Sequence, residues 1–278
     1  MKIVLKYFEV LCLLIIFSLS ARSPICDTYI IAGHAGLAPT IWTNRGDFLA
    51  ISCTVDTILD QSNILTLFKI PKFSSLFKSP WIIGGRIGYN WCQDFEVYLE
   101  SNYRQAGGRK FNLPNLVIPT IDTVTFILDM KKYRAVDAYL GVRYYGQSCG
   151  YDWLTWFIGG KFGFLHHYNV DFIFTTNSVL VPNPVGPFVS GALPFFIKST
   201  TPSGGVDIGF DVGIGCNCYV TMTGQIIATC GPKGSLIPFD VCTTGIAINP
   251  SLAPNGFMIG SIRTELFFPI TLGLKYYF

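Results

Sequence analysis

The last nine residues of the chain alternate between apolar and polar or small side chains, and this alternation constrains the fold more than any other feature. One face carries Ile270, Leu272, Leu274, Tyr276 and Phe278. The other face carries Thr271, Gly273, Lys275 and Tyr277. A period of two residues is that of a β-strand, in which successive side chains point to opposite sides of the sheet. The chain therefore ends in a strand with one apolar face.

The same alternation recurs along the chain, in segments close to the roughly 9–11 residues that a strand needs to cross a bilayer. We expect strands near residues 29–37, 81–91, 95–104, 124–130, 138–144, 156–164, 170–174, 206–214, 220–226 and 263–278. This pattern predicts an all-β chain that forms a closed antiparallel transmembrane barrel of about ten strands. Eight and twelve strands remain alternatives, because both termini of a bacterial barrel lie on one side of the membrane and the strand number is even.

The expected connections alternate between short and long. The short ones are residues 91–94, 131–136, 166–169 and 216–218. The long ones are residues 39–80, 105–119, 146–154, 176–203 and 230–258. Outer-membrane barrels have short periplasmic turns and longer outer loops. We therefore assign the short connections to the periplasmic side and the long ones to the cell surface.

The composition favours contact with lipid, since 50% of the residues are hydrophobic, only 13% are charged and the mean hydropathy is +0.43. Membrane-spanning helices are the first alternative. The best candidate, residues 176–197, contains four prolines, which would break the helical hydrogen bonds in lipid. A soluble β-sandwich is the second alternative. It would bury its apolar face, whereas here charged residues lie opposite the apolar face of nearly every strand.

The C-terminal stripe that ends in Leu274, Tyr276 and Phe278 resembles the assembly signal of outer-membrane barrel proteins. By its whole pattern the chain resembles the small outer-membrane β-barrel families, which include OmpA-like and narrow porin-like barrels. The resemblance covers the architecture and includes no motif specific to one member. It implies a place in the bacterial outer membrane, with the barrel-assembly machinery and outer-membrane lipid as partners.

Residues 1–21 have the features of a cleaved signal peptide. Lys2 and Lys6 make a basic start, residues 10–19 form an apolar run, and small residues follow, with cleavage expected after Ser20 or Ala21. An uncleaved membrane anchor is the alternative. Residues 22–278 then form a single outer-membrane β-barrel domain.

The polar face of the expected strands predicts a charge network inside the barrel. Its members are Arg86, Glu96, Glu100, Arg104, Asp129, Asp137, Arg143, Lys161, Asp171, Asp207, Asp211, Arg263, Glu265 and Lys275. Isolated buried charges are costly, so these groups should pair across the lumen. Narrow barrels are filled by their own side chains, which favours a structural network over a selective pore.

The sequence offers little for catalysis, metal binding or nucleic-acid binding. His166 and His167 fall in an expected periplasmic turn, and His34 has no carboxylate near it in sequence. Cys216 and Cys218 alone make a weak metal motif, and there is no basic block for a nucleic acid. We therefore expect that the protein is not an enzyme and that it binds no cofactor, no metal and no nucleic acid.

Removing the signal peptide takes away Cys12 and leaves eight cysteines for an oxidising compartment. The expected periplasmic end holds Cys26, Cys92, Cys216 and Cys218. The expected outer end holds Cys53, Cys149, Cys230 and Cys242. The even number at each end suggests disulfides, with free buried thiols as the alternative.

Two functions follow from these patterns. The first is a structural or surface-exposed barrel whose lumen is largely filled by charged side chains. The second is a narrow porin-like channel for small solutes or ions.

Overall fold

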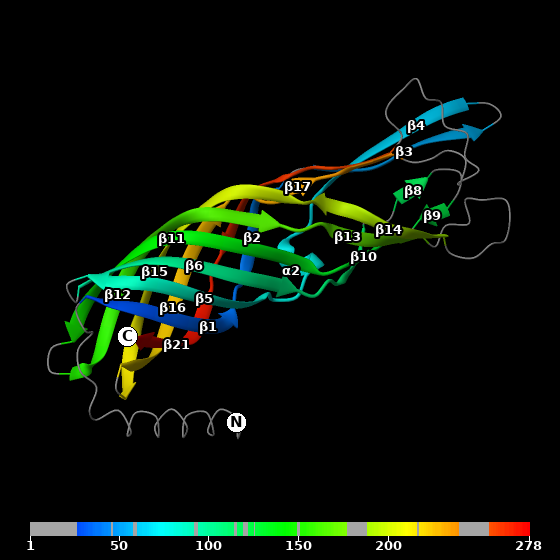
Figure 1. Cartoon of the computed structure of the whole chain (residues 1–278). Helices are drawn as coiled ribbons and strands as arrows, with labels where there is room; N and C mark the ends of the chain where they lie inside the picture. The colour runs from blue at the N-terminus through cyan, green and yellow to red at the C-terminus, as the bar shows by residue number, and fades with distance from the viewer. Residues whose placement is uncertain are drawn as a thin grey trace, which may run out of the picture.

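The computed structural model describes residues 27–45, 47–57, 60–91, 94–113, 116–118, 122–124, 126–148, 151–176, 188–215, 217–238 and 256–278. Eight long strands form a closed antiparallel barrel: β1 (Thr28–Leu37), β5 (Trp81–Trp91), β6 (Phe95–Ala106), β11 (Tyr133–Ser148), β12 (Tyr151–His167), β15 (Ser199–Gly215), β16 (Cys218–Thr229) and β21 (Ile270–Tyr277). They pair in chain order, and the pairing of β21 with β1 closes the ring (Figure 1).

The strand number is eight, one of the alternatives, because two of the expected turns are bends within continuous arms. β10 (Phe126–Met130) continues into β11, and β12 continues into β13 (Val170–Thr176). These two arms stay paired on both sides of the bend, with Ala135 opposite His167 and Met130 opposite Phe172. The expectation of tight turns at residues 131–136 and 166–169 is therefore wrong. Short polar breaks in the alternation mark a change of strand direction there.

The tight connections and the C-terminus lie at one end of the barrel, which we call the turn end. The main-chain N–H of Tyr145 donates to the carbonyl of Asp94 across 2.7 Å, and that of Tyr29 donates to Phe278 across 3.1 Å. These contacts place the ends of β5, β6, β11 and β21 together. β11 and β12 also meet there, with Ser148 opposite Tyr151, so the assignment of the connection at 146–154 to the outer side is wrong.

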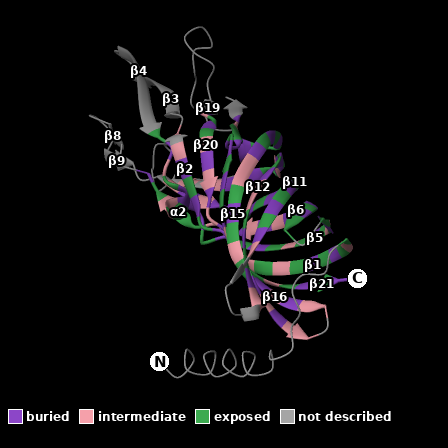
Figure 2. Cartoon of the chain, turned by 90° about the vertical axis from the view of Figure 1, so that its left-hand side faces the viewer, coloured by how far each residue is buried: buried purple, intermediate pink, exposed green. Residues whose placement is uncertain are grey.

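The barrel is apolar outside and polar inside. Along its strands, exposed and buried residues alternate (Figure 2). Phe162 and Ile208 are each 63% exposed, while Lys161 and Asp207 beside them are buried. The C-terminal stripe follows the same rule, with Leu274, Tyr276 and Phe278 exposed and Lys275 buried. This arrangement is that of a transmembrane barrel, in which apolar residues face lipid.

Aromatic side chains border the apolar belt at both ends. At the turn end, the rings of Tyr29 and Tyr89 lie 5.3 Å apart and those of Phe95 and Tyr144 lie 5.4 Å apart. At the opposite end, the Trp81 and Tyr103 rings are 5.5 Å apart. Aromatic girdles of this kind mark the two membrane interfaces of a barrel.

The end opposite the turns, which we call the loop end, carries extensive β-structure (Figure 1). β2 (Thr40–Arg45) and β20 (Ile262–Phe267) extend the barrel sheet. One further sheet has the order β17 (Lys233–Gly234), β14 (Phe188–Ile197), β13, β10, β7 (Lys110–Asn112). Another has the order β18 (Leu236–Pro238), β19 (Gly256–Ile259), β3 (Asp47–Thr57), β4 (Asp60–Lys69). β8 (Leu116–Ile118) pairs with β9 (Asp122–Val124), and a short helix, α2 (Phe73–Leu76), precedes β5.

None of the described helices has the length and apolar character that a bilayer span requires. The expected signal peptide, residues 1–21, lies outside the described residues.

Candidate functional site

The interior of the barrel is the candidate site, because every barrel strand directs polar or charged side chains into it. Among the described residues, five buried cations each contact a carboxylate. These pairs are Arg86–Glu96, Arg104–Asp137, Arg143–Asp207, Lys161–Glu100 and Lys275–Asp211. Arg86–Glu96 and Arg104–Asp137 join neighbouring strands, and the other three pairs join strands that are next but one in the barrel.

Near the turn end the network is centred on Lys275 of β21. Its Nζ lies 2.6 Å from Asp211 and 3.4 Å from Glu96, and it donates to the Tyr145 hydroxyl across 2.7 Å. Tyr145 in turn donates to Glu96. Arg86 approaches the other oxygen of Glu96 at 2.9 Å. Two cations and a hydroxyl thus surround one buried carboxylate.

In the middle of the barrel two further pairs fill the lumen. Arg143 Nε donates to Asp207 across 2.5 Å, and the guanidinium lies over the ring of Phe157 at 4.2 Å. Gly159 makes room for this pair, since a Cβ there would lie 2.4 Å from Asp207 Oδ1. Lys161 donates to Glu100 across 2.6 Å and to Gln225 across 3.0 Å. Both charged pairs are therefore held by side chains of at least two strands.

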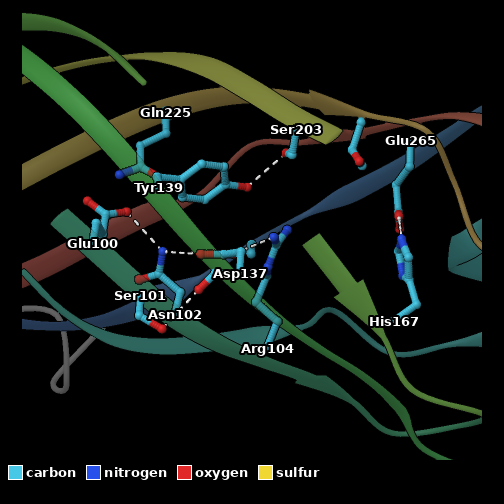
Figure 3. A network of polar contacts seen from close by, with 12 residues as sticks. Glu100, Ser101, Asn102, Arg104, Asp137, Tyr139, His167, Ser203, Gln225 and Glu265 are labelled. Atoms are coloured by element: carbon cyan, nitrogen blue, oxygen red, sulfur yellow. Dashed lines mark hydrogen bonds and ion pairs between the residues drawn. The ribbon is translucent and has the colours of Figure 1, made fainter. Parts of the chain in front are cut away.

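Asn102 of β6 joins the middle of the network to its loop end (Figure 3). Its amide group donates to Glu100 across 2.9 Å and to Asp137 across 2.7 Å. Asp137 also accepts from Arg104 at 2.5 Å. His34 lies 2.6 Å from the Asn102 carbonyl oxygen, so the lone histidine of β1 takes part in the same polar chain.

At the loop end a second cluster joins residues that are far apart in sequence. Glu265 accepts from Trp42 and from Tyr133, each across 3.0 Å, and its other oxygen lies 3.5 Å from His167 (Figure 3 shows the last contact). His167 also lies 3.2 Å from the Tyr133 hydroxyl. The sequence did not reveal this cluster, because His167 was assigned to a periplasmic turn. The assignment is wrong for His166 and His167, since both lie at the loop end.

An apolar group of side chains, the mouth cluster, covers the network on the loop side. Its aromatic members are Trp42, Phe73, Phe77, Tyr133, Tyr139, Phe172, Phe195, Phe196 and Phe267. The Trp42 ring meets Phe73 at 5.0 Å and Phe196 at 5.4 Å, both edge to face. The cluster joins α2 and loop-end strands to inward-facing residues of the barrel. No pattern in the sequence indicated it, because its members come from several separate connections and barrel strands.

Three of the predicted lumen charges lie elsewhere. Asp129 is in β10 and Asp171 is in β13, beyond the bends and outside the barrel strands. Arg263 is exposed on β20. The alternation of these segments continues that of the barrel strands, although the arms have left the barrel. The sequence pattern alone therefore placed them in the lumen.

The cysteines are only partly described. Cys218 is half-buried and Cys230 is exposed, and both are free. The side chains of Cys26, Cys53, Cys92, Cys149, Cys216 and Cys242 lie outside the described residues. The expected division of the cysteines between the two ends, and any disulfide among them, stays a prediction.

In the part of the chain that the structure describes, no three His, Cys, Asp or Glu side chains gather as a metal site requires. The chemistry that the lumen shows is the neutralisation of opposite charges.

The comparisons with known proteins concern the fold alone. No protein-family model matches the chain, and no curated protein matches it. Neisserial surface protein A is similar in structure, with 10% identity, a TM-score of 0.41, and cover of 90% of this chain and 97% of that chain. The outer membrane protein OprG from Pseudomonas aeruginosa is similar at 12% identity and a TM-score of 0.39, and the match covers 93% of this chain and 99% of that chain. The outer membrane protease OmpT from Escherichia coli is similar at 11% identity and a TM-score of 0.30, and the match covers 94% of this chain and 100% of that chain. At these values the likenesses assign no function.

Proposed function

We propose that the chain is a closed barrel of the bacterial outer membrane that holds its loop-end β-structure at the cell surface. Residues 1–21 direct export and are removed, and residues 22–278 insert as one domain. The barrel-assembly machinery recognises the exposed C-terminal stripe of Leu274, Tyr276 and Phe278. Outer-membrane lipid surrounds the belt, and the surface partner of the loops is unknown. This role is structural and involves no catalysis.

The observation that carries the proposal is the filling of the lumen. Arg104 and Arg143 are each 1% exposed, and each contacts a carboxylate. Barrels of about eight strands have an interior that side chains can fill, whereas wide aqueous channels need about 16–18 strands. The mouth cluster adds an apolar layer that hydrated ions do not cross readily. Together these layers support a barrel that does not conduct.

A catalytic role is the less supported alternative. His167 and Glu265, the pair nearest to an acid–base site, are both 0% exposed and lie within the mouth cluster. A substrate could not reach them in this arrangement.

A narrow channel is the second candidate, and one observation favours it. Several buried polar atoms have no hydrogen-bond partner among the described residues, including Asp211 Oδ1, Thr221 Oγ1 and Arg104 Nη1. Buried polar groups of this kind usually bind water. A file of water molecules through the lumen would satisfy them and could carry small ions.

Single-channel recording in planar bilayers separates the two functions. We expect the folded, purified protein to give no conductance steps at low voltage, because paired charges and the mouth cluster block the lumen. Heat-modifiable migration on gels checks that the inserted protein is folded. Regular steps from such a preparation would contradict the closed barrel and favour the channel.

A further inference from the structure

The exposed cations are concentrated at the loop end of the barrel. These residues are Lys69, Lys72, Lys78, Arg109, Lys110, Lys131, Lys132, Arg134, Lys198, Lys233 and Arg263. Within the described part of the chain, no ion pair joins any of them to a carboxylate. The exposed acidic residues of the turn end, Asp27 and Asp94, lie at the opposite side of the membrane. Among the side chains that the structure describes, the loop end therefore presents positive charge without an ion-pair partner, and its described carboxylates outside the lumen, Asp129 and Asp171, are half-buried.

Main-chain contacts show that several of these cations follow the rim of the barrel. Lys78 N–H donates to Gly107 across 2.8 Å, and Met130 N–H donates to Arg109 across 3.1 Å. Tyr168 N–H donates to Arg134 across 3.1 Å. The cations thus occur at the bends, directly above the lipid-facing belt. Anionic groups of the membrane surface lie at the same level as such a rim.

One part of the rim is arranged to hold an anion. Arg134 lies outward on β11 with its guanidinium 5.6 Å from the centre of the Tyr168 ring. His166 lies 2.8 Å from the Thr200 hydroxyl, and its ring meets that of Tyr168 at 5.1 Å. Lys198 is exposed two residues before Thr200. Two cations, an imidazole and a hydroxyl are therefore available on one outer surface of three neighbouring arms.

A lipid-facing groove of about 660 Å³ lies below this part of the rim, and we call it the belt groove. Its floor consists of three small residues that pair directly across three neighbouring strands, Gly85, Ser101 and Ala138. The larger side chains of its walls are Ile87, Leu99, Leu140, Phe162 and Phe164. Arg134 and Ala138 share a face of β11, four residues or about 13 Å apart. That separation fits within one leaflet of a bilayer, about 20 Å thick with its headgroups.

We propose that the rim and the belt groove together bind one phosphorylated membrane lipid on the loop side of the membrane. Arg134 and Lys198 hold the phosphate, His166 and Thr200 supply further polar contacts, and an acyl chain lies over Gly85, Ser101 and Ala138. The cations of the rim lie next to an apolar groove, and this combination favours a lipid over a soluble anion. The lipid site is independent of whether the lumen conducts.

Native mass spectrometry of the detergent-solubilised full chain with added dioleoyl phosphatidate tests the proposal. We expect one retained lipid per barrel in the wild type, and roughly 30-fold weaker retention in Arg134→Gln/Lys198→Gln. The matched control Lys72→Gln/Lys110→Gln removes the same charge from the same end. It should change retention less than three-fold. An equal loss in both pairs, or no loss in either, would overturn the site.

Two further experiments test the groove. Dibutyryl phosphatidate and inorganic phosphate have the anion without a long chain, and neither should displace the retained lipid at equal concentration. Gly85→Leu fills the groove, where an added Cβ meets nothing closer than 3.5 Å, and should weaken retention at least five-fold. Gly160→Leu, also lipid-facing with open space around it, is the control and should leave retention unchanged.

Displacement by inorganic phosphate would show that the anion binds alone and would contradict the lipid site. Unchanged retention in Gly85→Leu would contradict the acyl-chain part of the proposal. A dimer that disappears in Gly85→Leu while lipid retention persists would assign the groove to a second copy of the chain instead. All six substituted positions face outward, so heat-modifiable migration should stay normal in every variant.

Discussion

Replacing Arg143 with Leu is expected to lower the free energy of unfolding by about 3–5 kcal/mol, the cost of breaking a buried ion pair. Arg143 is 1% exposed and donates to Asp207 across 2.5 Å. The substitution leaves the Asp207 carboxylate in the lumen without its cation. It also removes the contacts of the guanidinium with the rings of Phe157 and Tyr98, at 4.2 and 5.0 Å. Urea unfolding of the protein in lipid vesicles measures the loss.

The matched control is the double variant Arg143→Leu/Asp207→Leu. Removing both charges leaves no unpaired carboxylate, and replacement of a buried pair by apolar residues is often neutral. The double variant should therefore be more stable than Arg143→Leu alone. If the single variant unfolds at the wild-type urea concentration, the pair lies in water and the lumen is not filled as described.

Replacing Phe162 with Arg is expected to destabilise the barrel by about 2–4 kcal/mol, the cost of a cation near the bilayer midplane on a barrel exterior. Phe162 is 63% exposed on β12 and forms a wall of the belt groove. Its neighbour Lys161 points to the other side and contacts Glu100 in the lumen. The same unfolding measurement in vesicles detects the change.

Phe162→Leu is the matched control, because it keeps an apolar side chain in contact with lipid. It should lower the free energy of unfolding much less than Phe162→Arg does. A wild-type stability for Phe162→Arg would mean that this face of β12 meets water. The lipid-facing register of the strand would then be wrong, and with it the placement of Lys161 in the lumen.

The alternation of side chains predicted the barrel because it acts locally, within single strands. Register follows from it, since a shift by one residue would move Lys275 into lipid and Leu274 into the lumen. The number of strands was harder to predict from the sequence. Lys131-Lys132 and Tyr168-Asn169 interrupt the alternation as a turn would, whereas the structure continues both arms through them.

The polar side of the strands also predicted most of the side chains that meet in the lumen, including Glu96, Arg143 and Lys275. It could not predict which cation meets which carboxylate, because the partners lie on different strands. The contacts of Glu265 with Trp42 and His167 depend on three separate segments. Such long-range contacts follow from the closed barrel and its loop-end additions, and no local pattern encodes them.

The location of Lys131 and Lys132 tests the eight-stranded barrel most directly. Intact cells are treated with a membrane-impermeant amine reagent, and the modified lysines are identified by mass spectrometry. Both lysines are exposed at the loop end, so we expect them to be modified on intact cells, while the buried Lys161 and Lys275 stay unmodified. In a ten-stranded barrel, residues 131–136 would form a periplasmic turn. Modification of Lys131 and Lys132 only after the outer membrane is permeabilised would contradict the barrel described here.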